Sequence, residues 1–408
     1  MKPQPAATES EQAVAAAASN PLALLLLALG LPSTALAAGD ALDADKVLGA
    51  RPATQVELVQ TRITAYDQTG YGYQSQAGPK AGPGSETLHV LQAQGEFVMK
   101  QGENLTHRVW VPVDLVTSAS ADASDRYYAQ PDVVSHASAQ NIAAEVDYQL
   151  GVRAGPETTW TAGAGMHYEE NFLSWLYTLE YQRSLAEDNA TLTLSAQQAL
   201  DWFDAFRLGG SRAGRTSRST TSFNVGLSQL LSPSTLVAFA YGFTLQRGEL
   251  SNTWNSVPST DGERVSESLP RLRDRHAASV ALLQWLPWEG ALELKYRFYR
   301  DDWEVTAHSF EARLRQRLFG RLTLGASYRH HTQTGVFCFT TLTPLASSYR
   351  TADSDLGPLD SDSLGGSAEV TLPTRRHGTL FLTFGYDHYV RTDALRVNVA
   401  TWASGLRF

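Results

Sequence analysis

The chain has 408 residues, a formal net charge of −9 and a single cysteine, Cys338. One cysteine excludes an internal disulfide framework and a cysteine-rich metal site. The acidic balance, without a basic stripe, argues against nucleic acid as a partner. No apolar run reaches the roughly 18 residues that a transmembrane helix requires.

The first 37 residues predict a cleavable export signal. An apolar run at 21–31 is followed by Ala35-Leu36-Ala37, a small-x-small pattern typical of signal-peptide cleavage. The leader is atypical, because residues 1–20 carry one lysine and two glutamates where a basic patch is expected. An ordinary buried helix is the alternative. Residues 38–53 would then form a short periplasmic segment before the first strand.

From residue 54 onward, apolar and polar residues alternate with period two, which predicts β-strands. In 291–303, for example, Leu292 and Leu294 lie on one face, while Glu293 and Lys295 lie on the other. Each such strand has roughly 10–14 residues, enough to cross a bilayer at the usual tilt. We expect about sixteen strands, within a range of fourteen to eighteen. The expected spans are 54–66, 86–99, 104–117, 140–152, 157–168, 172–185, 188–200, 217–231, 234–248, 274–287, 290–302, 304–317, 320–332, 363–373, 378–391 and 395–408.

The connections at one end of the expected strands are long, and those at the other end are short. The long ones all follow odd-numbered strands, while the connections after even-numbered strands are short turns such as Leu318-Phe319-Gly320. An outer-membrane barrel requires this asymmetry, with short periplasmic turns and long extracellular loops. The expected long loops are 67–85, 118–139, 201–216, 249–273 and 333–361.

The last expected strand ends in an aromatic residue. Ala400, Trp402, Leu406 and Phe408 share one face of it. In a membrane barrel the last strand pairs with the first, so that no strand edge is left in lipid. The pattern resembles the terminal signal that the barrel-assembly machinery recognises in outer-membrane proteins. We therefore expect Trp402, Leu406 and Phe408 to form an assembly signal, with that machinery as a partner.

Together these patterns predict an all-β protein. Residues 54–408 would form one closed antiparallel transmembrane β-barrel in the bacterial outer membrane, in contact with lipid and lipopolysaccharide. Most tryptophans lie near expected strand ends, where amphipathic rings favour the membrane interface.

Three stretches between 268 and 339 resemble a known family. They contain Ser268-Leu-Pro-Arg-Leu-Arg-Asp-Arg-His276, Leu294-Lys-Tyr-Arg-Phe-Tyr-Arg-Asp-Asp-Trp303, and Tyr328-Arg-His-His-Thr-Gln333 followed by Val336-Phe337. They are similar to motifs of an uncharacterised family of outer-membrane barrels, domain of unknown function 3570. The chain departs from the family at Phe337-Cys338-Phe339, where Asp-Phe-Tyr is expected. The resemblance implies a barrel and transfers no catalytic residue.

Charged residues alternate with apolar residues along the expected strands 290–302, 304–317 and 320–332. If the apolar faces meet lipid, the charged faces line the interior, because each arginine at mid-membrane would cost about 2–4 kcal/mol against hydrocarbon. We expect the basic side chains to pair across strands with Glu293, Asp301 and Glu311. Two interpretations of this charged ladder stay open: a charge-selective constriction, or an ion-pair network that only stabilises the wall. The candidate pore-lining residues are Lys295, Arg297, Glu311, Arg313, Arg315 and Arg329.

The sequence Asp301-Asp302-Trp303 predicts a tight turn at a strand end, with Trp303 at the membrane interface. His308 and the pair His330-His331 make a metal site conceivable. Adjacent strand residues point to opposite faces, however, so we interpret the motif as a structural turn and expect no metal. We expect no cofactor either. The acidic stretch from Asp353 to Asp362 lacks the ligand spacing of a calcium loop, so we expect a solvated loop there.

We expect a pore for small polar or charged solutes. The alternative is a sleeve or anchor for partner proteins of the envelope, in export or surface electron transfer. A barrel-embedded hydrolase with a Ser–His or Asp–His pair across strands is the third hypothesis. Because no phosphate loop or nucleophile elbow occurs, we do not expect an enzyme.

Overall fold

The structure is a computed structural model. It describes residues 54–71, 86–120, 139–206, 208, 211–252, 255–343, 348–374 and 378–408. The expected signal peptide (1–37) and the segment 38–53 lie outside the described residues. In the part of the chain that is described, no helix is long and apolar enough to cross a membrane.

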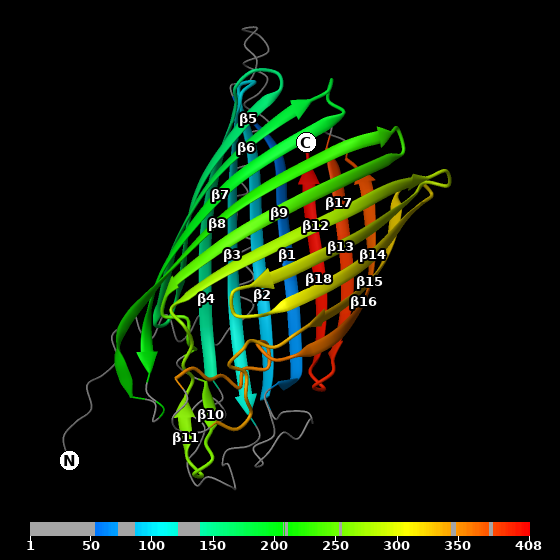
Figure 1. Cartoon of the computed structure of the whole chain (residues 1–408). Helices are drawn as coiled ribbons and strands as arrows, with labels where there is room; N and C mark the ends of the chain where they lie inside the picture. The colour runs from blue at the N-terminus through cyan, green and yellow to red at the C-terminus, as the bar shows by residue number, and fades with distance from the viewer. Residues whose placement is uncertain are drawn as a thin grey trace, which may run out of the picture.

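Long antiparallel strands close into a single barrel in which consecutive long strands are neighbours, and β1 pairs with β18 (Figure 1). The chain between β9 and β12 forms a separate two-stranded ribbon, β10 (Ser256–Pro258) with β11 (Arg264–Ser266). The barrel strands are β1 (Thr54–Tyr71), β2 (Glu86–Gln101), β3 (Leu105–Ser120), β4 (Ala139–Arg153), β5 (Thr158–Glu169), β6 (Phe172–Leu185), β7 (Ala190–Phe206), β8 (Arg212–Ser232), β9 (Thr235–Gly248), β12 (Leu272–Leu286), β13 (Gly290–Asp301), β14 (Thr306–Leu318), β15 (Leu322–Gln333), β16 (Leu359–Pro373), β17 (Thr379–Arg391) and β18 (Arg396–Arg407).

The fold class is therefore confirmed: the protein is a closed antiparallel barrel of 16 strands. Each expected span coincides with one of these strands. Some strands extend further at the end with the long connections than the alternation alone indicates, as β1 does by continuing to Tyr71.

One expected loop, 201–216, is wrong. β7 continues to Phe206 and β8 begins at Arg212, and the two strands stay paired up to those residues. An ion pair between Arg218 Nε and Asp201 Oδ2 (2.8 Å) joins them, and a second one joins Arg212 to Asp204. Small and polar residues that read as loop in the sequence are held as strand by these cross-strand charges.

The outward face of the barrel is apolar. Large side chains with one-third to two-thirds of their surface exposed lie along it, including Leu179, Phe239, Phe384 and Trp402. Exposed apolar residues in this number and continuity mark a surface that meets lipid rather than water.

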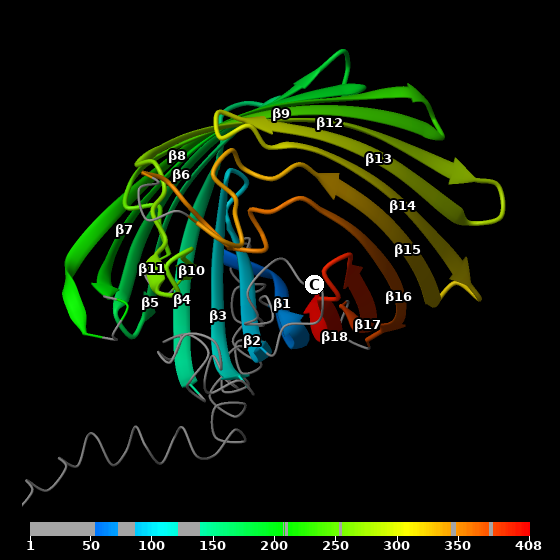
Figure 2. The same ribbon diagram turned by 60° about the horizontal axis from the view of Figure 1, so that its bottom comes forward.

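The two ends of the barrel differ as the sequence predicts. At the inner end β14 and β15 are joined by a tight turn, in which Phe319 (φ 53°) and Gly320 (φ 67°) adopt the left-handed conformation. At the outer end two long connections follow β9 and β15. We name residues 249–252 with 255–271 the first inward segment and residues 334–343 with 348–358 the second inward segment. Figure 2 shows them at the opening of the barrel, with the second reaching across it toward β10 and β11.

Candidate functional site

Contacts with the inward segments identify the inner face of each strand. Arg391 on β17 reaches Ser354, and Arg273 and Arg275 on β12 line a cavity together with Leu269 and Asp355. Side chains alternate along a strand, and partners in register share a face. The registers therefore extend this inner face around the whole barrel, because the pairing is continuous from β1 to β18.

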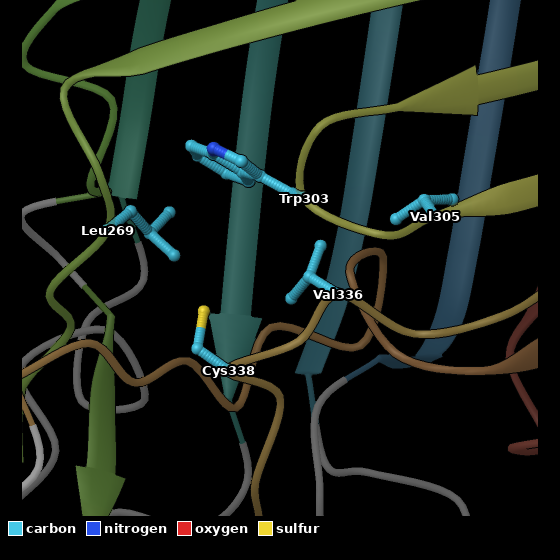
Figure 3. Close-up of a cluster of buried hydrophobic side chains, with 5 residues drawn as sticks. All are labelled: Leu269, Trp303, Val305, Val336 and Cys338. Carbon is cyan, nitrogen blue, oxygen red and sulfur yellow. The ribbon is translucent and has the colours of Figure 1, made fainter.

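A buried apolar cluster fixes both inward segments to the barrel wall. Leu269 from the first segment, Val336 and Cys338 from the second, and Trp303 and Val305 from the β13–β14 connection pack together. Figure 3 shows their side chains converging from these separate stretches of chain. Burial raises the pKa of the Cys338 thiol to about 11, because the thiolate would lose its hydration there.

Asp301, the last residue of β13, organises the β13–β14 turn. Its Oδ1 accepts hydrogen bonds from the backbone N–H groups of Trp303 (3.1 Å) and Val305 (2.9 Å). Its Oδ2 accepts from Arg273 Nε (2.9 Å) and from the Tyr299 hydroxyl (2.8 Å). The Asp301 side chain is fully buried, so this carboxylate replaces its lost hydration with hydrogen bonds and an ion pair.

Trp303 does not lie at the lipid interface, which corrects the expectation from its sequence position. It is 3% exposed and points into the barrel, where its ring lies under the Arg273 guanidinium at 4.4 Å. Its Nε1 donates to the backbone carbonyl of Leu272 (2.9 Å). Asp302 and Trp303 do form a turn, but the turn anchors a lumenal core.

A buried glutamate joins the two inward segments. Glu267 accepts hydrogen bonds from the backbone N–H of Asn252 (2.5 Å) and from the hydroxyl of Thr351 (2.5 Å). Bridges between Ser259 and Thr343 and between Ser268 and Arg350 align the same segments. Burial outweighs these hydrogen bonds and raises the pKa of Glu267 to about 7.

The second inward segment is also tied to β15 and β17. Arg391 pairs with Asp355 and donates to the Ser354 hydroxyl (2.7 Å). Gln333 Nε2 donates to the carbonyls of Asp355 (2.9 Å) and Gly357 (2.8 Å). Asp355 also lines a cavity with residues of β8, β9 and β12, so the stretch around it crosses the inside of the barrel. β16 begins at Leu359, so the end of the expected solvated loop is strand, while the Asp355 side chain remains 61% exposed.

The strands β13, β14 and β15 bring the candidate pore-lining residues together on the inner face. The register places Lys295 opposite Glu311 and Glu311 opposite Arg329. Arg313 forms an ion pair with Glu311. Asp301 binds Arg273 instead of this ladder, contrary to expectation. Among the described residues, Lys295, Arg297, Arg315 and Arg329 have no carboxylate within 4.0 Å, so this wall carries an excess of positive charge.

The opposite wall is acidic. The strand order places β4 across the barrel from β14. Inward positions on β2–β6 are occupied by Glu96, Asp114, Glu145, Asp147, Glu169 and Glu180. Some are balanced: Arg108 Nε lies 2.8 Å from Glu96 Oε1, and His167 Nδ1 lies 3.5 Å from Glu145 Oε2. No local sequence pattern reveals this wall, because its carboxylates are spread over five strands.

The inner face also holds a Ser–His pair. Ser309 Oγ lies 2.8 Å from His331 Nδ1, and His331 Nε2 lies 3.3 Å from Gln333 Oε1. A catalytic triad needs a carboxylate to stabilise the imidazolium, and Gln333 supplies a neutral amide instead. Within the described residues no group of three or more His, Cys, Asp or Glu is placed to hold a metal ion.

The stretches that carry the family resemblance meet in this region. Leu269 and Arg273 from the first stretch, Asp301 and Trp303 from the second, and Gln333 from the third all dock the inward segments. Sequence reasoning identified these stretches but not their shared role. Glu267 and Arg391 were missed, since neither stands in a pattern that sequence reasoning recognises.

The closed barrel with its apolar outer face defines an outer-membrane β-barrel protein. Residues 26–393 match the family described as "Protein of unknown function (DUF3570)", and the chain belongs to that family. No curated protein matches the chain.

Several solved structures are similar in fold. A bacterial polysaccharide outer membrane secretin is 10% identical, with a TM-score of 0.44 over 86% of this chain and 99% of that one. A FadL homologue from Pseudomonas aeruginosa is 8% identical, with a TM-score of 0.44 over 86% and 90%. OccK2 (OpdF) from Pseudomonas aeruginosa, in complex with glucuronate, is 10% identical, with a TM-score of 0.41 over 87% and 97%. At these identities the likeness concerns the barrel fold alone.

Proposed function

We propose that the protein is a channel for small polar or charged solutes across the bacterial outer membrane. One observation carries this proposal: charged side chains of opposite sign face each other across the inner surface, on β2–β6 and on β13–β15. A wall that only needed to be stable would pair its charges locally, as Arg313 and Glu311 do. Opposed walls instead produce a transverse field that orients passing solutes.

The inward segments define the narrow part of the proposed channel. They are fixed by the Asp301–Arg273 pair, by the apolar cluster and by Arg391, so they narrow the opening of the proposed channel. Such a constriction brings solutes close to the charged walls, where the low-dielectric surroundings strengthen each interaction.

The test is conductance of the refolded protein in planar bilayers under a salt gradient. Neutralising Arg313 and Arg315 together (Arg313→Gln, Arg315→Gln) removes two positive charges from the basic wall. We expect the ratio of chloride to potassium permeability to fall by about twofold or more, in line with an electrostatic contribution of about 0.4 kcal/mol per twofold change. Arg300→Gln with Arg321→Gln is the matched control, since it removes the same charge away from the inner face of the barrel strands.

Absence of any channel, or an equal shift in the control, would contradict the proposal. The sleeve or anchor for envelope partners remains the second candidate, and co-purification of a partner in mild detergent would favour it. The hydrolase remains the third, and loss of ester or peptide hydrolysis in Ser309→Ala would reveal it. Recognition of Trp402, Leu406 and Phe408 by the assembly machinery stays a prediction.

A further inference from the structure

A cavity of about 340 Å³ lies beneath the second inward segment. Asp355 bounds it on one side, and the inner faces of β15, β16 and β17 form the other. The register brings Arg329, Ser363 and Tyr389 into one row across these strands, with His331, Ser361 and Arg391 in the adjacent row.

The two arginines of this cavity differ in their partners. Arg391 is engaged by Asp355, by Asp393 and by the hydroxyl of Ser354, so the negative charge of Asp355 is already neutralised. Arg329 has no carboxylate within 4.0 Å among the described residues. Its register partner Glu311 binds Arg313 instead. Arg329 therefore offers its guanidinium to the cavity.

The neighbouring polar groups are mainly hydroxyls. Ser361, Ser363 and Tyr389 line the cavity with Arg329, and Arg297 lies in register, through Ser309, with His331 at its edge. Hydroxyl and guanidinium groups together donate hydrogen bonds to an anion, and a guanidinium matches a carboxylate in a planar, two-point arrangement. Leu359 supplies an apolar contact.

We propose that this cavity binds the carboxylate group of a small organic anion, with Arg329 as the principal ligand and Ser363 and Tyr389 as hydroxyl donors. The inference rests on the proposed channel, in which the cavity is a stopping point for anionic solutes beneath the constriction. A volume of a few hundred Å³ is of the size that small-molecule sites have in proteins.

Isothermal titration of the refolded full-length protein in detergent tests the site. Benzoate and benzamide are the probes, because they have nearly the same size and differ in charge. We expect benzoate to bind at least about tenfold more tightly than benzamide, since hydrogen bonds to a charged carboxylate are stronger than those to a neutral amide. Arg329→Gln should weaken benzoate binding by about tenfold or more. Arg317→Gln, an exposed inward arginine outside the cavity, is the matched control and should leave binding unchanged.

Equal binding of the two probes, or benzoate binding that is unchanged in Arg329→Gln, would overturn the site. If Arg329→Gln fails to fold, Ser363→Ala and Tyr389→Phe each remove one donor and should each weaken benzoate binding by about threefold or more. The bilayer experiment separates the two proposals. Benzoate binding without conductance would retain the site and reject the channel, while conductance without benzoate binding would do the reverse.

Discussion

Two walls of the same barrel have different interiors. On β12–β17 the inner face carries buried groups such as Asp301, Arg273 and Arg391, which hold the inward segments. On β2–β6 it carries carboxylates, of which Glu96 and Glu145 have basic partners on adjacent strands. Both walls follow the same alternation of apolar and polar residues. Alternation selects which residues face inward, while contacts with the inward segments add a buried core on the first wall.

The family motifs lie on the first of these walls. Asp301 and Trp303, expected at a turn and at the membrane interface, instead form one buried unit with Arg273. This unit holds the inward segments against the barrel wall. The residues that select solutes would then be the inward charges that remain unburied, on both walls.

Asp301→Ala should remove the difference between the two walls by releasing the inward segments. It leaves the buried Arg273 guanidinium without its carboxylate, and breaking such a pair typically costs about 3–5 kcal/mol. We expect both inward segments to detach while the barrel remains closed. Limited proteolysis should then cut within both inward segments, and single-channel conductance should rise. Asp302→Asn, at the adjacent exposed position, is the control, and equal proteolysis of the two variants would contradict the role of Asp301.

A second prediction uses Cys338 as a reporter of the apolar cluster. In the native protein at pH 8 we expect the thiol to react slowly with a thiol reagent, because burial raises its pKa to about 11. Trp303→Ala removes the largest side chain of the cluster and should expose the thiol. The pKa would return toward about 8.5, and the reaction should accelerate by about 100-fold. Trp303→Phe keeps an aromatic ring and should keep most of the protection; fast labelling of the unmodified protein would refute the buried cluster.

A third prediction concerns the pH dependence with which the inward segments dock. The pKa of Glu267 is raised from 4.5 to about 7 in the docked state, so protonated Glu267 favours docking. This contribution, at most about 3 kcal/mol, is fully present below pH 4.5 and is lost as the pH rises through about 7. Proteolysis of the inward segments should therefore be about tenfold faster at pH 8 than at pH 5, after correction for protease activity.

Glu267→Gln mimics the protonated side chain and should remove this dependence on pH. Proteolysis of the barrel strands serves as an internal reference, because the hydrogen bonds of Glu267 go to Asn252 and Thr351 in the inward segments. A pH dependence that persists in the variant would assign the effect to another group.

Much of the fold could be predicted from the sequence, because a strand in a membrane barrel is constrained locally. The faces of β13 and β14 follow from alternation alone, since a charged residue such as Arg313 cannot face hydrocarbon. The short inner turns followed from the spacing of the strands. The span of β7 and β8 could not be predicted, because the pairs Asp201–Arg218 and Asp204–Arg212 exist only once the strands are in register.

The candidate site divides in the same way. The basic ladder was predictable because Lys295 and Arg297 alternate within one strand and Arg313 and Arg315 within the next. The acidic wall was not, because Asp114, Asp147 and Glu180 come from separate strands and become one surface only through the order of the barrel.

The closed barrel with one polar and one apolar face follows from the sequence alone, because period-two alternation is a property of each strand. Only the tertiary structure decided that Trp303 is core rather than interface, and that the connection after β15 crosses the lumen. Those outcomes depend on contacts between residues far apart in the chain, such as Thr351 with Glu267, and no local pattern encodes them.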